Sequence, residues 1–167
     1  KVLAPQMLSD KTYVKQFVNE ARAASALNHP YIAQIYSICQ HKEIYYYAME
    51  YVEGESLQEI LDKRKVLSGM KCIDYMIMAA EGLQFASKKG IIHRDIKPGN
   101  IFLTDKGEVK ILDFGLAKLA GMDFTKSTSS KGTAAYMSPE QIKGEKVDLR
   151  SDIWSLGIVL YELLTGH

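Results

Sequence analysis

Long apolar runs, charge of one sign and cysteine are all scarce in this sequence, and each scarcity excludes a class of protein. The longest apolar stretch, near residues 153–164, is interrupted by polar residues and a glycine. It is too short to cross a bilayer and predicts a buried helix. The net charge is only +1, which does not favour binding to nucleic acid or to a membrane surface. Cys39 and Cys72 stand in apolar segments, so we expect buried free thiols in a reducing compartment.

Histidine clusters, internal repeats and low-complexity linkers are also missing. Four histidines are scattered singly, so no zinc site is indicated. What is present is ordinary globular composition: 167 residues, 47% hydrophobic and 25% charged, which is enough for a sizeable core. We see no signal peptide at the start and expect a cytoplasmic protein, with any membrane anchor lying outside this chain.

One short stretch concentrates chemically active side chains. It reads His93-Arg94-Asp95-Ile96-Lys97-Pro98-Gly99-Asn100, and Asp113-Phe114-Gly115 follows it. Between the two, the sequence predicts a strand at 101–103, a tight turn at 104–107 and a second strand at 109–112. A base, a cation and two oxygen ligands at the ends of one hairpin are what phosphoryl transfer from a metal-bound nucleotide requires.

These motifs, with Ser138-Pro139-Glu140 further along, resemble the catalytic loop, the magnesium-binding turn and the end of the activation segment of eukaryotic-type (Hanks-type) protein kinases. The sequences of the motifs are most similar to those of bacterial serine/threonine kinases. The resemblance implies a bilobal α+β fold, present here as a truncated domain. A partial antiparallel-sheet N-lobe covers residues 1–50, a hinge covers 51–55 and a partial helical C-lobe covers 56–167.

The resemblance also implies roles in the transfer step. Asp95 orients the substrate hydroxyl and accepts its proton, and Lys97 neutralises charge on the transferring group. Asn100 and Asp113 supply oxygens to Mg²⁺. Thr133 reaches Asp95 and Lys97 at the substrate-docking end. A lysine two residues after the aspartate is the serine/threonine pattern.

In the N-lobe, the resemblance predicts an ion pair between Lys1 and Glu20 that holds the α- and β-phosphates. Glu20 lies in a predicted helix over 10–27 and, taken alone, is an ordinary solvated charge. Ala24 replaces a larger apolar residue that the family usually places there, so packing against Ile35 and Phe114 is expected to be thin.

The nucleotide site is expected around two strands, at 32–39 and 44–52. Glu50 and Val52 resemble the hinge that binds adenine through its backbone, and Met49 limits the back of the pocket or is plain core. Ser56 opens a helix through a capping box with Glu59, and its position in the family also lies near the ribose.

Several residues of the helical part carry two interpretations. His93 is expected to pack beneath Phe114 instead of acting as a base. Asp152 either anchors the catalytic loop or simply caps a helix that begins near Ser151. Phe102 is expected to pack under the adenine ring.

A separate helix after Ser68 is expected to bury one apolar stripe: Ile73, Met76, Ile77, Ala80 and Leu83.

Residues 116–140 correspond to the activation segment, whose hydroxyl cluster is either a phosphorylation switch or a merely flexible polar loop. The cluster comprises Thr125, Ser127, Thr128, Ser129 and Ser130. Neither the residues nor the resemblance selects one of the five.

The most direct interpretation is an ATP- and Mg²⁺-dependent kinase acting on Ser or Thr of proteins, without nucleic-acid partners. The alternative is a nucleotide-binding or interaction module that is catalytically impaired in this truncated form. No glycine-rich loop precedes Lys1, so we expect weak ATP binding and little turnover from the chain as given. The arginine that usually pairs with Glu140 is also absent.

Overall fold

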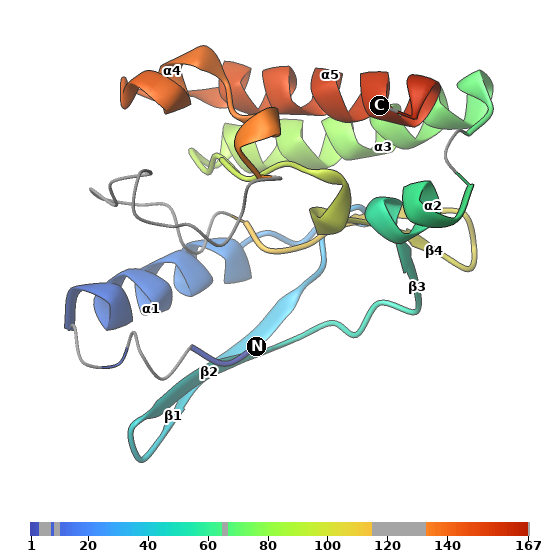
Figure 1. Cartoon of the computed structure of the whole chain (residues 1–167). Helices are drawn as coiled ribbons and strands as arrows, with labels where there is room; N and C mark the ends of the chain where they lie inside the picture. Colours follow the sequence, from blue (N-terminus) through green and yellow to red (C-terminus); the bar gives the residue numbers. More distant parts are fainter. Residues whose placement is uncertain (4–7, 9–10, 65–66, 115–132, 167) are drawn as a thin grey trace.

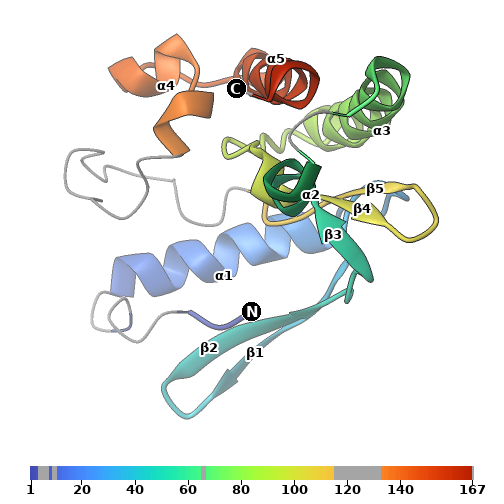
Figure 2. The same cartoon turned by 45° about the vertical axis from the view of Figure 1, so that its right-hand side comes forward.

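The computed structural model describes residues 1–3, 8, 11–64, 67–114 and 133–166. A hairpin and a long helix form one part of the molecule, and a layer of helices forms the other (Figure 1). A small second sheet lies beside the helix α2 (Leu57–Arg64), between these two parts (Figure 2). The α+β architecture expected from the sequence is confirmed.

The hairpin consists of β1 (Ile35–His41) and β2 (Ile44–Met49), paired antiparallel. Aromatic and β-branched residues favour strands here, and Lys42 closes the turn with a φ of 53°. The two strands expected at 32–39 and 44–52 are therefore confirmed as strands. Their observed ends differ from the expected ones, because β1 ends at His41 and β2 ends at Met49. Val2 forms an isolated antiparallel bridge with Tyr46 of β2.

The helix α1 (Lys11–Ser25) lies against this hairpin. Phe17, Ala21 and Ala24 form its buried face, as the spacing of apolar residues predicts. Ala24 shares the hydrophobic core with Ile35 and Phe114. The thin packing expected around Ala24 stays a prediction.

The second sheet has the order β3-β4-β5, with every pair antiparallel. It contains β3 (Gly54–Ser56), β4 (Ile101–Thr104) and β5 (Val109–Ile111). Gly107, at a φ of 81°, closes the turn between β4 and β5. The hairpin expected between the two motifs is confirmed, and it places one motif at each of its ends.

The helical layer is formed by α3 (Gly69–Lys88) and α5 (Leu149–Thr165), which run side by side. The short helices α2 (Leu57–Arg64) and α4 (Pro139–Lys143) flank them, and 3₁₀ turns lie at Pro98–Asn100 and Thr133–Tyr136. The capping box at the start of α2 is confirmed, because Ser56 and Glu59 bond to each other's backbone N–H groups.

The stripe expected on α3 is only partly buried, so the predicted face was partly wrong. Met76 and Leu83 are buried, but Ile73 and Ile77 are about half exposed. The buried face instead includes Cys72, Tyr75, Ala79, Gly82 and Ala86. The apolar residues of α3 surround much of the helix, so their spacing alone did not select one face.

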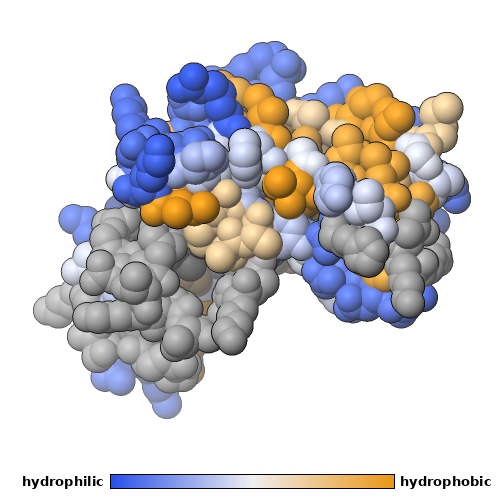
Figure 3. Space-filling model, turned by 45° about the horizontal axis from the view of Figure 1, so that its top comes forward, coloured by the Kyte–Doolittle hydropathy of each residue, from blue (hydrophilic) through white to orange (hydrophobic). Residues whose placement is uncertain are grey.

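The expectation of a fully buried α5 was also wrong for the described residues. Ile153, Trp154 and Tyr161 are about half exposed or more. Hydrophobic side chains accordingly gather on the surface of the helical layer (Figure 3). Cys72 is buried as expected, whereas Cys39 is only half buried. Among the described helices, none combines the length and apolarity needed to span a bilayer.

Candidate active site

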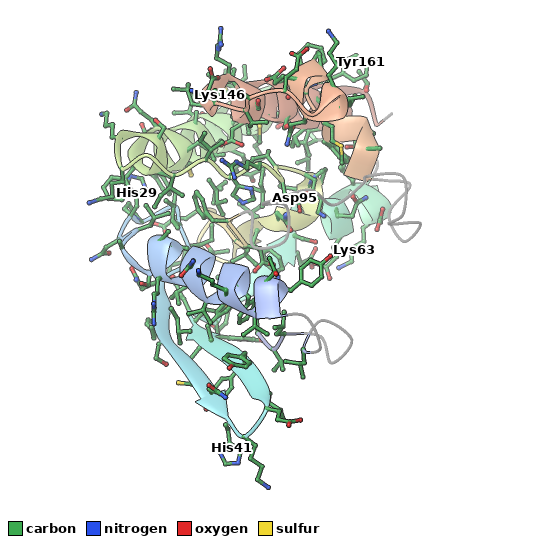
Figure 4. All side chains as sticks on the ribbon, turned by 90° about the vertical axis from the view of Figure 1, so that its left-hand side faces the viewer. His29, His41, Lys63, Asp95, Lys146 and Tyr161 are labelled. Atoms are coloured by element: carbon green, nitrogen blue, oxygen red, sulfur yellow. The ribbon has the colours of Figure 1, made fainter. Side chains whose placement is uncertain are left out.

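Three polar side chains of the catalytic loop converge on one another. Lys97 Nζ lies 3.1 Å from Asp95 Oδ2, and the same oxygen accepts a hydrogen bond from Asn100 Nδ2 at 3.1 Å. Asn100 Nδ2 also donates to the backbone carbonyl of Asp95 at 2.8 Å. Asp95 lies near the middle of the molecule, between α1 and the helical layer (Figure 4). The predicted trio is therefore brought together, and its amide and ammonium groups hold the carboxylate.

The loop is anchored from α5 by a buried carboxylate. Asp152 accepts the backbone N–H groups of His93 and Arg94, each at 2.8 Å. Arg94 has a φ of 65°, so the chain turns sharply directly before Asp95. The cap of α5 is a different residue, Asp148, whose side chain accepts from Arg150 N. Of the two interpretations of Asp152, anchoring is the one the geometry supports.

His93 is a fully buried structural residue. Its ring lies 4.7 Å from the ring of Phe114, as expected. Nδ1 accepts the backbone N–H of Asp95, so Nε2 carries the proton and donates to the carbonyl of Leu112 at 2.9 Å. Burial lowers the pKa of His93, against the opposing effect of three nearby aspartates. The imidazole is therefore neutral and connects the loop to the strand end before Asp113.

Asp113 is held by two donors from the hairpin side of the molecule. Lys1 Nζ lies 2.8 Å from Oδ2, and the hydroxyl of Tyr47 donates to Oδ1 at 3.0 Å. The expected partner of Lys1 was Glu20, whose side chain lies outside the part of the molecule that the structure describes. Sequence reasoning missed Tyr47, although alternation along β2 places it on the same face as Met49.

The donor set fits Mg²⁺. Asn100 uses its amide nitrogen on Asp95, which leaves the amide oxygen available to a metal, and Asp113 would contribute a carboxylate. The backbone N–H of Leu112 donates to the carbonyl of Asn100 at 2.9 Å, which keeps the two candidate ligand residues close. The described residues contain no group of three His, Cys, Asp or Glu with metal-binding geometry. Mg²⁺ needs no such group, because it commonly takes one or two carboxylates and completes its shell with water and phosphate oxygens.

The expected adenine side of the site lies where β2 passes into the second sheet. Met49 packs against the core, and Val52 and Phe102 are half buried. The carboxylate of Glu50 pairs with Lys110 of β5 at 2.7 Å and accepts the backbone N–H of Gln34. This ion pair joins the expected hinge to the strand that precedes Asp113.

Ser56 is buried, and its hydroxyl donates to Glu59 Oε2 at 2.8 Å while accepting the backbone N–H of Glu59. Capping is therefore its observed role, and a contact with ribose stays a prediction.

The expected substrate-docking side is only partly described. The side chain of Thr133 lies outside the described part, as do residues 115–132 with the hydroxyl cluster. Gln141 donates to the carbonyl of Arg94 at 2.8 Å, which ties α4 to the catalytic loop. The hydroxyl of Ser151 donates to Glu140 and lowers the pKa of that carboxyl. A serine thus contacts the glutamate that an arginine usually pairs with in the family.

Two features together define the class of protein kinases. The first is a small antiparallel sheet with one long helix, next to a helical layer. The second is a loop that contains Asp95, Lys97 and Asn100 and lies close to a second aspartate, Asp113. Comparison with known proteins agrees: the profile of the protein kinase domain matches residues 1–167, and the chain belongs to this family.

The chain is similar to bacterial serine/threonine kinases. It is 41% identical over 172 residues to a probable serine/threonine-protein kinase of Streptomyces coelicolor, covering 99% of this chain and 26% of that protein. It is 40% identical over 174 residues to the serine/threonine-protein kinase PknB of Mycolicibacterium smegmatis, covering 100% of this chain and 28% of the relative. The chain therefore spans about a quarter of the length of these curated relatives.

A solved structure gives the same result for the fold. The PknI kinase domain of Mycobacterium tuberculosis superposes with a TM-score of 0.80 at 28% identity, over 99% of this chain and 62% of that domain. The kinase fold inferred from the motifs is confirmed.

Proposed function

We propose that the protein containing this chain transfers the γ-phosphoryl group of ATP to serine or threonine hydroxyls of proteins. The observation that carries the proposal is the convergence of Asp95, Lys97 and Asn100 beside a second held carboxylate, Asp113. Similarity to bacterial serine/threonine kinases supports the choice of acceptor. The cytoplasmic location expected from the sequence stays a prediction.

In this proposal the substrate hydroxyl oxygen attacks the γ-phosphorus, the bond to the β–γ bridging oxygen breaks, and ADP leaves with that oxygen. Asp95 orients the hydroxyl and accepts its proton. A carboxylate is a weak base, so its larger contribution is positioning. Lys97 shares a carboxylate oxygen with Asn100 and is close enough to Asp95 to neutralise charge on the transferring group.

The remaining residues hold the nucleotide and the metal. When bound, Mg²⁺ neutralises charge on the phosphate oxygens, and Asp113 and Asn100 are the residues that would hold it. Lys1 is the candidate for the α- and β-phosphates, with Glu20 as its proposed partner. The backbone of Glu50 and Val52 and the side chains of Met49, Phe102 and Ser56 are proposed to surround the adenosine.

Two substitutions test the function in the full-length protein. Asp113→Asn removes the charged metal ligand and is expected to abolish transfer to a protein substrate. Asp95→Asn is expected to leave ATP binding unchanged and to lower kcat at least a hundredfold, the scale of lost acid–base catalysis. Asp105→Asn, in the exposed turn after β4, is the matched control and should behave as wild type.

Phosphate transfer by Asp113→Asn at the wild-type rate in saturating Mg²⁺ would reject the assignment. Nucleotide binding without any transfer by the wild-type protein would instead favour the non-catalytic module.

We also propose that phosphorylation of the hydroxyl cluster activates the enzyme. Within the described part of the chain, Nε of Arg94 is buried and has no hydrogen-bond partner. A buried guanidinium N–H without a partner is costly, and a phosphate can supply a bidentate partner to the group. Because the backbone of Arg94 precedes Asp95 directly, such a pair would order the segment beside the catalytic carboxylate.

Mass spectrometry of the full-length kinase after incubation with ATP is expected to find phosphate within residues 125–130. Replacing all five hydroxyl residues by alanine should lower activity at least tenfold, equivalent to about 1.4 kcal/mol of barrier. In a variant that already contains Arg94→Gln, the same replacement should not lower activity any further. Full activity of the five-fold variant would remove the switch from the proposal but leave the kinase function in place.

A further inference from the structure

Lys1 and Tyr47 are direct cross-strand neighbours. The backbone nitrogen of Lys1 donates to the carbonyl of Tyr47 at 2.8 Å, and the N–H of Tyr47 donates back to the carbonyl of Lys1 at 2.9 Å. Residues that exchange both bonds in an antiparallel pair project their side chains to the same face. Both side chains therefore leave the sheet together, and both reach Asp113.

The tyrosine is buried and packs against helix α1. Only 1% of Tyr47 is exposed, and its ring lies 5.5 Å from the ring of Phe17 on α1. A buried phenol needs a hydrogen-bond partner, since burying the hydroxyl alone would be costly. Burial, with a smaller effect of Asp113, raises the pKa of Tyr47 far above its ordinary value. The hydroxyl donates a hydrogen bond to Oδ1 of Asp113 at 3.0 Å.

Each of the two donors contacts a different oxygen of the Asp113 carboxylate. Tyr47 takes Oδ1 and Lys1 takes Oδ2, while the backbone of Asp113 is held at a φ of 54°. A carboxylate offers about four lone-pair positions, so two donors leave positions on the same group for a metal. Hydrogen bonds to a metal-binding carboxylate fix its orientation, and losing such a partner commonly costs 10- to 100-fold in metal affinity.

We propose that Tyr47 is a positioning residue for the metal ligand Asp113: its hydroxyl fixes the carboxylate, and its ring links that orientation to helix α1. This inference rests on the proposed function, because it assigns Tyr47 a part in binding Mg²⁺ with the nucleotide. The contact joins residues that are 66 positions apart in the chain. It therefore depends on α1, β2 and the end of β5 packing together.

The test measures nucleotide binding and needs no turnover. The affinity of the full-length protein for a non-hydrolysable ATP analogue is determined by calorimetry, once in EDTA and once in excess Mg²⁺. Tyr47→Phe is expected to reduce the gain in affinity caused by Mg²⁺ about tenfold, while the affinity in EDTA changes less than twofold. The affinity in EDTA also serves as a check that the variant is folded.

Tyr46→Phe is the matched control. Tyr46 directly precedes Tyr47 in β2, pairs with Cys39 across the hairpin and points to the opposite face. It should keep the wild-type affinity in both conditions.

A wild-type metal effect in Tyr47→Phe overturns the inference and leaves the proposed function intact. Equal losses with and without metal also overturn it, because they indicate a purely structural role. If the wild-type protein shows no effect of Mg²⁺ on nucleotide binding, the proposed function fails together with the inference.

Discussion

At the scale of single residues, the candidate site depends on polar side chains that are held in place by buried partners. Asp152 shows this most clearly, because its two oxygens accept two consecutive backbone N–H groups of the catalytic loop. Only 4% of the residue is exposed, so water cannot replace it. Removing the carboxylate would leave both N–H groups unsatisfied in the interior.

Asp152→Ala is therefore expected to lower the free energy of unfolding by about 3 kcal/mol, and Asp152→Asn, which keeps one acceptor, by about half of that. Urea unfolding of the full-length protein, monitored by the fluorescence of Trp154, measures both changes. We expect kcat of the asparagine variant to fall more than its KM changes, since the loop that carries Asp95 loses an anchor.

Asp148→Asn is the control on the same helix. Asp148 caps α5 at a half-exposed position, and asparagine caps about as well as aspartate. If Asp148→Asn and Asp152→Asn lower the free energy of unfolding by equally small amounts, Asp152 does not anchor the loop.

At the scale of secondary-structure elements, the second sheet brings the expected hinge next to the catalytic hairpin. Gly54 begins β3 at a φ of 147°, and it pairs with Thr104 of β4. A Cβ atom at Gly54 would lie only 2.1 Å from the carbonyl oxygen of Leu103. The strand can approach this closely only because the residue has no side chain.

Gly54→Asn is expected to lower the free energy of unfolding by more than about 3 kcal/mol, because backbone atoms must move apart. The same substitution at Gly107 is the control. That glycine also has a positive φ, but a Cβ there would meet nothing within 4 Å. Asparagine tolerates the left-handed region, so Gly107→Asn should cost about 1 kcal/mol or less. Similar unfolding midpoints in urea for the two variants would contradict this explanation.

At the scale of the whole molecule, stability is expected to depend on pH through His93, which lies where the catalytic loop, α5 and β5 meet. Its ring is fully buried and accepts the N–H of Asp95 on Nδ1, so it is neutral in the folded protein. Burial lowers its pKa despite the negative charges of Asp152, Asp95 and Asp113. In the unfolded chain it takes up a proton near pH 6.5.

The unfolded state consequently binds more protons than the folded state below about pH 6.5. The stabilisation from His93 is fully present above that pH and is lost as the pH falls, with a slope of up to about 1.4 kcal/mol per pH unit. Urea unfolding at pH 7.5 and 5.5 measures the loss. His93→Phe should be less stable than wild type at pH 7.5 but lose less between the two values.

His41→Asn, at the exposed end of the hairpin, should keep the wild-type pH dependence. Burial raises the pKa of Asp152, and a raised carboxyl pKa makes the free energy of unfolding change with pH in the opposite direction. Because the wild type and both histidine variants contain Asp152, this effect is common to all three proteins. An unchanged pH dependence in His93→Phe would contradict the assignment.

The sequence by itself determined the local elements and the residues of the catalytic loop. The capping box of Ser56 and Glu59 and the turn at Gly107 follow from interactions between residues a few positions apart, which local sterics and hydrogen bonding decide. Asp95, Lys97 and Asn100 converge for the same reason, because one short loop contains all three. The capping box and the turn were predicted and are confirmed, and the catalytic roles of the three loop residues stay predictions.

Only the tertiary structure decided which face of α3 is buried and which distant residues hold Asp113. Tyr47 reaches Asp113 across 66 positions, and Asp152 reaches His93 across 59. The buried face of α3 was likewise misjudged from its spacing, since apolar residues surround much of that helix. A partner at such a separation depends on how whole elements pack, and the energy that selects the packing is shared among many contacts instead of residing in one motif.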